Sequence, residues 1–224
     1  MKGLFITATG TEIGKTLVTA SLCHQLRKAG KPIAALKPII SGIDRTDMKG
    51  TDTAIIASGL GLPLTDDTIN AISPFRYKAP LAPSMAAKLE GRTLDYDRLI
   101  QTCQLALDEN TFTVIEGVGG SFVPLTDNRL VANWIKDLGL HSIVVAGSYL
   151  GTLSHITATL EAMEARGLPV TALIISQSAG HDHPDFEETV RQAQAWTKVP
   201  VIAIPRIHQS PPWEHAPDIL STLK

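Results

Sequence analysis

Cysteine and net charge are scarce in this sequence, and long hydrophobic runs are absent. The 224 residues include two cysteines, Cys23 and Cys103, which lie far apart and form no CxxC pair, so neither a disulfide framework nor a zinc site is expected. We interpret both as small buried hydrophobic residues. A net charge of −2 and a pI of about 6.4, without a dense run of Lys and Arg, argue against a nucleic-acid partner.

The features of secretion and membrane insertion are also lacking. The first thirty residues have no basic start, apolar stretch and small-residue cleavage site in succession, and no apolar run approaches the roughly 18 residues of a membrane span. We therefore expect a cytoplasmic protein with no membrane partner. No internal repeat and no low-complexity linker divides the chain, and 44% of its residues are hydrophobic, so we expect a single domain over residues 1–224.

Short apolar runs rich in β-formers alternate with longer segments of helical period. The expected strands are 3–9, 32–37, 112–117, 141–147, 170–176 and 199–205. The expected helices lie near 15–29, 52–59, 95–109, 129–138, 154–166 and 185–197. Runs that are apolar throughout suit strands covered on both faces, so the pattern predicts an α/β fold with a doubly wound, mostly parallel sheet flanked by helices. The stretch 63–84, rich in Pro, Ser and Thr, is expected to be irregular.

The stretch TATGTEIGKT, residues 7–16, ends like a phosphate-binding loop but does not begin like one, because Thr9 stands where the pattern GxxxxGK(S/T) has its first glycine. It follows an expected strand and opens an expected helix, so backbone N–H groups and the helix dipole converge there on an anion. Lys15 is expected to neutralise phosphate oxygens, and the hydroxyl of Thr16 to bind Mg²⁺. The alternative is an ordinary glycine-containing turn with a solvated lysine; the strand-loop-helix context favours nucleotide binding.

A phosphate site needs carboxylates to hold its metal. Glu116 ends the expected strand FTVIEG, and the following GVGG, residues 117–120, allows the backbone to approach a ligand closely. The alternative is a charge that merely ends a strand, and we favour the functional interpretation. Asp52 precedes an expected helix, where its spacing alone favours an N-cap.

Six segments together resemble one enzyme family. They are TGTEIGKT, KPIISG (37–42), TDTA (51–54), IEGVGG (115–120), VPLTD (123–127) and LGTLSH (150–155). In order and spacing they resemble the dethiobiotin synthetases, which have a P-loop NTPase fold, and the resemblance covers nearly the whole chain. The loop of that family typically reads GTxTxVGKT, so Ala8 replaces its first glycine, and a positive φ at Ala8 would strain the loop.

The resemblance implies ATP-dependent carboxylation and ring closure of 7,8-diaminononanoate with CO2, through a carbamate and a carbamic-phosphoric anhydride, to dethiobiotin, ADP and phosphate. ATP would be the co-substrate and Mg²⁺ the cofactor, held by Thr16, Asp52 and Glu116. Lys37 and Lys15 would be the catalytic cations. The implied nucleotide-binding residues are Glu12, Ile13, Gly14, Lys15, Thr16, Leu17, Asp52, Glu116, Gly117, Val118, Gly119, Gln177, Ser178, Pro205, Arg206 and Ile207.

Lys37 ends the second expected strand, and the alternative to a functional role is a strand-end lysine that merely extends into water. The family uses this lysine and a following serine near the carbamate, so the resemblance implies that Thr11, Lys37 and Ser41 bind substrate. It further implies a homodimer, in which backbone N–H groups at a helix start of the partner subunit hold the distal carboxylate of the substrate. The matching residues are Leu150, Gly151, Thr152, Leu153 and Ser154. From the sequence alone, a capped helix without a ligand is an equal alternative at that position.

Two other functions share parts of this pattern. A partner-regulated switch ATPase of the MinD/ParA kind carries a signature lysine where Gly10 stands here. An ATP-dependent amide synthase of the cobyrinate type carries a glutamine-hydrolysing domain for which this chain is too short. A His-Asp-His stretch at residues 181–183 is expected to be an exposed loop and not a metal site, and Trp196 is expected to be a packing residue and not a stacking platform.

Overall fold

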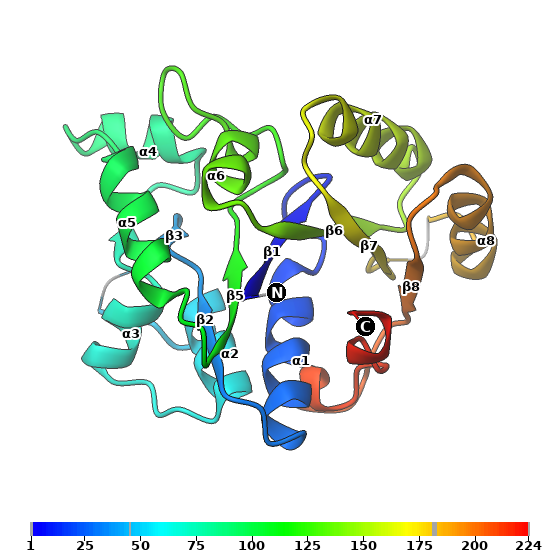
Figure 1. Ribbon diagram of the computed structural model, residues 1–224, viewed down its shortest axis with the longest axis horizontal. Coiled ribbons are helices and arrows are strands. Elements are labelled where there is room, and N and C mark those ends of the chain that lie inside the picture. The colour runs from blue at the N-terminus through cyan, green and yellow to red at the C-terminus, as the bar shows by residue number, and fades with distance from the viewer. Residues whose placement is uncertain (1, 45, 181–182, 224) are drawn as a thin grey trace.

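The computed structural model describes residues 2–44, 46–180 and 183–223. Its centre is a parallel sheet of six strands in the order β2-β5-β1-β6-β7-β8 (Figure 1). The strands are β1 (Gly3–Ala8), β2 (Ile33–Leu36), β5 (Phe112–Glu116), β6 (His141–Gly147), β7 (Val170–Ser176) and β8 (Val201–Ile204). Each adjacent pair is parallel, which confirms the predicted sheet.

Helices cover both faces of the sheet. The predicted helices are present as α1 (Lys15–Lys28), α2 (Asp52–Leu60), α5 (Tyr96–Ala106), α6 (Val131–Leu138), α7 (Thr152–Ala165) and α8 (Phe186–Trp196). Alternate residues of β1 separate two cores: Phe5 packs with α5 to α8, whereas Leu4 and Ile6 pack with α1 and α2. Phe5 meets the ring of Trp134 edge-on, with ring centroids 4.9 Å apart. The alternation follows from the period of two in a strand.

The stretch 63–84 is not irregular, contrary to the prediction. It contains α3 (Asp66–Ile72) and β4 (Phe75–Arg76), which pairs with β3 (Ile39–Ile40), and α4 (Pro83–Leu89) begins at its end. The hydroxyl of Thr65 accepts a hydrogen bond from Thr68 N and so caps α3, and Asp66 and Asp67 occupy its first turn. This cap and the acidic first turn are sequence signals of a helix start that the prediction missed.

The C-terminal segment packs against α1. It contains two short 3₁₀ turns, η1 (Pro212–Glu214) and η2 (Leu220–Leu223). The amide of Gln25 donates to Pro217 O at 2.8 Å and accepts from Ile219 N at 3.0 Å, and Ile219 is buried. The segment is therefore held beside the helix that starts at the phosphate-binding loop.

Four further expectations concern Trp196, the His-Asp-His stretch, the two cysteines and membrane-spanning helices. Trp196 ends α8 and is 76% exposed, so the prediction that it is a packing residue is wrong. Of the His-Asp-His stretch, residues 181 and 182 lie outside the described residues. Cys23 and Cys103 are buried free cysteines, as predicted. In the part of the chain that the structure describes, no helix has the length and apolar character needed to cross a bilayer.

Candidate active site

The phosphate-binding loop, residues 9–14, joins the carboxyl end of β1 to the first turn of α1. Ala8 ends β1 opposite Val145 and has no positive φ, so it is not the point of strain. Positive φ occurs instead at Glu12, at 57°, and at Gly14, at 102°. Thr9 N donates to Val145 O at 2.9 Å, which anchors the start of the loop to β6.

A cavity of about 390 Å³ opens beside this loop. It is lined by Thr11, Glu12, Ile13, Gly14, Lys15, Thr16, Leu17, Lys37, Ile40, Ser41, Asp52, Glu116, Val118 and Gly119. The carboxyl ends of β1, β2, β3 and β5 and the first turns of α1 and α2 supply these residues, as expected for a ligand site of a parallel sheet. The structure thus brings together the predicted phosphate, metal and carbamate residues. Gly117 is buried and does not line the cavity; its Cα lies against the ring of Phe5.

Lys37 is the centre of a charge cluster in this cavity, in which Lys37 and Glu116 are buried and Asp52 is partly exposed. Its Nζ atom lies 2.6 Å from Glu116 Oε1 and 3.1 Å from Asp52 Oδ2. Burial opposes the charged form of Lys37, yet the carboxylates of Glu116 and Asp52 outweigh it and raise the pKa of the lysine above its ordinary value. Burial also opposes the charged form of Asp52, but Lys37 and hydrogen bonds from Lys37 and Thr16 hold the pKa of Asp52 below its usual value. Lys37 and Asp52 are therefore both charged at neutral pH.

Lys15 is in a different electrostatic position. It is 6% exposed, and Nζ donates to Gly10 O at 3.0 Å, so its bonded partner is a neutral carbonyl. Burial lowers the pKa of Lys15 to about 8, Lys37 acts in the same direction, and Glu116 and Asp52 oppose the shift only in part. An anion bound in the loop would restore the balance and stabilise the ammonium form.

Oxygen donors suited to a hard divalent cation meet at one side of the cavity. The hydroxyl of Thr16 donates to Glu116 Oε1 at 2.9 Å. Glu116 is fully buried, and its Oε2 atom has no hydrogen-bond partner among the described residues. A buried carboxylate oxygen without a partner is costly unless a ligand completes it. Two carboxylates and a hydroxyl fit Mg²⁺, which prefers oxygen ligands.

A second, smaller cavity of about 190 Å³ adjoins the first through Leu17, which lines both. Its other lining residues are Ser176, Gln177, Pro205, Arg206, Ile207 and Pro212. The side-chain oxygen of Gln177 accepts a hydrogen bond from Arg206 N at 2.8 Å, which fixes the amide in the wall. The predicted residues Gln177 and 205–207 are thus brought together.

Ser178 does not line this cavity. Its hydroxyl accepts from Ser148 N and its backbone N donates to the hydroxyl of Ser148, both at 3.0 Å, so it ties β7 to the end of β6. Sequence reasoning missed Ser176 and Pro212. Pro212 lies 35 residues after Gln177 and reaches the cavity only because the C-terminal segment folds back along α1.

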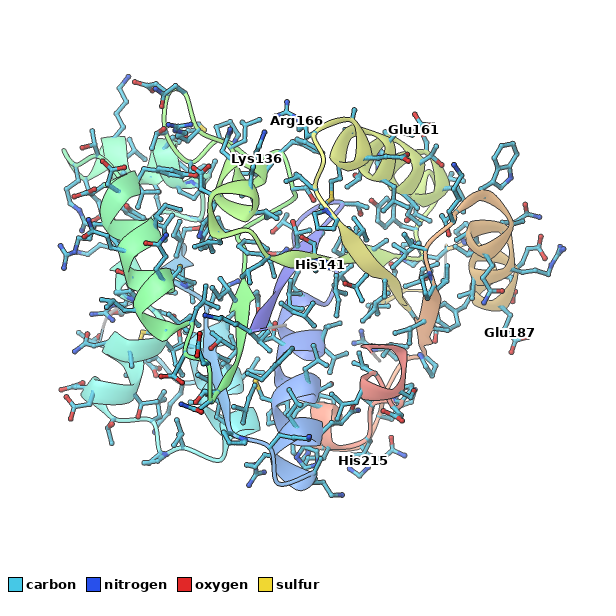
Figure 2. The ribbon with its side chains drawn as sticks, in the orientation of Figure 1. Lys136, His141, Glu161, Arg166, Glu187 and His215 are labelled. Carbon is cyan, nitrogen blue, oxygen red and sulfur yellow. The ribbon has the colours of Figure 1, made fainter. Side chains whose placement is uncertain are left out.

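The predicted carboxylate site at the start of α7 is separate from both cavities in this chain. Gly151 is the N-cap, with φ of 94° and no side-chain cap, and Leu150 is 83% exposed. Thr152 is buried and donates its hydroxyl to Gly147 O at 2.6 Å. Leu153 and Ser154 line another hollow, between α7 and α8, with Trp196 and Glu161; Glu161 is labelled on α7 in Figure 2.

Comparison with known proteins gives consistent results. A family model described as an AAA domain matches residues 2–212. The ATP-dependent dethiobiotin synthetase BioD of Methylobacterium nodulans is 40% identical over 201 residues, which cover 87% of this chain and 88% of the relative. The protein of the same name from Caulobacter vibrioides is 40% identical over 92% of this chain and 93% of the relative. That from Bacillus subtilis subsp. natto is 36% identical over 84% and 79%.

Solved structures with the same fold are more distant in sequence. The MinC:MinD cell division complex of Aquifex aeolicus aligns with a TM-score of 0.55 at 13% identity, over 92% of this chain and 81% of the other. A ParA family ATPase from Chlorobium tepidum aligns with a TM-score of 0.53 at 13% identity, over 93% and 86%. These likenesses confirm the predicted P-loop NTPase fold and nothing finer.

Proposed function

The chain belongs to the dethiobiotin synthetase family, and on that premise we propose that it uses ATP and CO2 to close a cyclic urea on 7,8-diaminononanoate. The products are dethiobiotin, ADP and phosphate. One observation carries the proposal: a phosphate-binding loop, a second buried lysine and two carboxylates face a single cavity of about 390 Å³. This cavity offers the cations that a reaction between anions requires.

The reaction has three steps that balance in atoms and charge. One amine of the substrate attacks CO2 and loses a proton, which gives a carbamate anion. A carbamate oxygen then attacks the γ-phosphorus of ATP, and the bond to the bridging oxygen breaks as ADP leaves. The second amine attacks the carbonyl carbon, phosphate leaves, and loss of the proton from nitrogen gives the neutral urea. The last step is intramolecular, so holding the two amines in place lowers its barrier without a covalent enzyme intermediate.

Two lysines supply positive charge where negative charge accumulates. Lys15 follows the loop and would bind the γ-phosphate oxygens. Their negative charge would raise the pKa of Lys15, which burial lowers. Lys37 would hold the carbamate near the transferred phosphoryl group, and its ion pairs with Glu116 and Asp52 keep it protonated. Ser41 and Thr11, at the wall of the same cavity, would position the substrate amine.

We assign Mg²⁺ to Thr16, Asp52 and Glu116. The bare Oε2 atom of Glu116 supports this assignment, and so does the hydrogen bond between Thr16 and Glu116. When bound, the ion would neutralise phosphate charge. The nucleotide base would occupy the adjoining cavity of about 190 Å³, beside Gln177 and residues 205–207. The reaction consumes ATP, which cells hold inside the plasma membrane, so we also propose a cytoplasmic location.

The distal carboxylate of the substrate would be held by a second copy of the chain. The start of α7 has no side-chain cap and no acidic residue in its first turn, which leaves its N–H groups favourable to an anion. It lies outside the two cavities assigned to substrate and nucleotide in its own subunit, so a partner subunit would have to bring it to the site. Leu150→Asp should separate the dimer and raise KM for the diamine while ADP binding is retained. Unchanged mass by light scattering together with unchanged KM would refute this part of the proposal.

The decisive experiment is an assay of purified protein with Mg·ATP and bicarbonate, with and without 7,8-diaminononanoate, in which phosphate release and product mass are followed together. We expect phosphate release that depends on the diamine and a product with the mass of the cyclic urea. Phosphate release that ignores the diamine, without a urea product, would contradict the proposal and favour a switch ATPase.

Lys37→Ala tests the role of the second lysine. We expect it to abolish urea formation while ADP binding, measured by calorimetry, remains. Lys31→Ala is a matched control, because Lys31 is exposed near the opposite end of β2 and should leave turnover unchanged. Turnover retained in Lys37→Ala would remove Lys37 from the reaction.

A further inference from the structure

The two carboxylates assigned to the metal already share a cation, and that cation is a side chain of the protein. Lys37 Nζ lies 2.6 Å from Glu116 Oε1 and 3.1 Å from Asp52 Oδ2, and only 4% of Lys37 is exposed. It also approaches Gly117 O at 3.4 Å. The ammonium group therefore lies between the two carboxylates that would hold a divalent ion.

A divalent ion and this ammonium group compete for the same two carboxylate groups. Glu116 Oε1 already accepts hydrogen bonds from Lys37 and from the hydroxyl of Thr16, whereas Glu116 Oε2 has no partner among the described residues. Mg²⁺ binds oxygen at about 2.0–2.1 Å, so an ion bound to both carboxylates, even through Glu116 Oε2, would have to share these two groups with Lys37. Glu116 is fully buried, and charges in a buried site are screened weakly by salt. Like charges at such short range disfavour each other strongly.

We propose that Lys37 is the resident cation of the Glu116–Asp52 pair and has to withdraw before that pair can bind a divalent ion. The inference rests on the proposed function, because it uses the metal ligands assigned there. Lys37 then has two successive partners. It neutralises the carboxylates before the divalent ion binds, and after withdrawal its charge is available to anionic substrate groups in the same cavity.

The nucleotide is the ligand that would favour withdrawal. Its phosphate oxygens would lie at the loop that lines the cavity with Lys37, and they offer the ammonium group another anionic partner. Metal binding should therefore be weak without nucleotide and strong with it. Removal of the Lys37 ammonium should uncouple the two ligands, because the carboxylates would then lack a competing cation.

Mn²⁺ is a suitable probe, because electron paramagnetic resonance measures the free ion directly. Its affinity is measured with and without ADP for the wild type, Lys37→Met and Lys31→Met. Lys31 is exposed, so its variant controls for the loss of one positive charge. We expect Lys37→Met to bind Mn²⁺ without ADP about tenfold more tightly than the other two proteins, a typical coupling between sites, and the difference to shrink with ADP.

The outcomes separate this inference from the function on which it rests. Equal affinities in all three proteins without ADP would overturn the inference and leave the proposed function intact. Absence of Mn²⁺ binding in all three, even with ADP, would remove the metal assignment and the inference together. If Lys37→Met does not fold, the wild type decides the question. The nitrogen-15 resonance of the Lys37 ammonium, identified by its loss in Lys37→Arg, should then move on addition of Mg²⁺ and ADP; an unmoved resonance would overturn the inference.

Discussion

Gly14→Ala should destabilise the protein by two separate effects whose sizes can be estimated. Gly14 has φ of 102°, and an L side chain in the left-handed region costs about 1–2 kcal/mol. The added Cβ would also lie 2.9 Å from Ser176 Oγ and 3.1 Å from Ser176 Cβ, and overpacking of this kind costs about 1–3 kcal/mol. Together the two effects should lower the free energy of unfolding by about 2–5 kcal/mol.

Gly139→Ala separates the two effects, because Gly139 has φ of 64° and no atom within 4 Å of an added Cβ. It should show the backbone cost alone. Ser176→Gly and the double variant Gly14→Ala/Ser176→Gly complete a double-mutant cycle, and urea unfolding gives the free energy of unfolding of each protein. The steric cost of Gly14→Ala then appears as the coupling energy between the two substitutions. ADP affinity should fall in Gly14→Ala and return in part in the double variant. Equal losses for the two glycine variants, or strictly additive losses in the cycle, would refute the reasoning.

Three further predictions concern titration and nucleotide contacts. Because the pKa of Lys15 is lowered to about 8, the unfolded chain binds more protons than the folded one from about pH 8 to the ordinary lysine value, so this residue should raise stability with pH in that window. Urea unfolding of the wild type against Lys15→Met between pH 7.5 and 10 tests this, and a falling difference would contradict it. Burial raises the pKa of Cys23 and Cys103 to about 12, so a thiol reagent at pH 8 should modify neither in the native protein and both in urea; rapid native reaction would contradict their burial. Gln177→Leu should raise KM for ATP several-fold with little change in kcat, because it removes the amide beside the proposed base site and leaves Arg206 N without its acceptor. An unchanged KM would mean that the nucleotide base binds elsewhere.

The sequence predicts long, strongly patterned elements well and short ones poorly. The central strands β1, β5, β6 and β7 are largely buried runs whose apolar character on both faces is visible without a structure. The pair β3 and β4 has two residues in each strand, and their contact joins Ile39 to Phe75, which no local pattern encodes. Trp196 is predicted to be a packing residue, whereas it ends α8 and is exposed, because no local pattern shows whether a neighbouring element covers the end of a helix.

The candidate site divides in the same way. The loop, Lys15 and Thr16 are contiguous, so their order along the chain already predicts a phosphate site, and Glu116 at a strand end could be selected by position. The assigned roles remain predictions until the assays above are made. The residues Ser176 and Pro212 could not be selected, because each reaches its cavity through tertiary packing and not through a motif.

By itself, then, the sequence determined the parallel α/β fold, the phosphate-binding loop and the family resemblance, because these depend on hydrophobic period and on residues close together in the chain. Only the tertiary structure decided that Lys37 lies between Asp52 and Glu116. These residues come from β2–β3, α2 and β5, and the distances of 2.6 and 3.1 Å between their charged atoms depend on how the strands align in the sheet and how α2 packs beside it. Electrostatic energy depends on distance and burial, and neither is written in the order of residues.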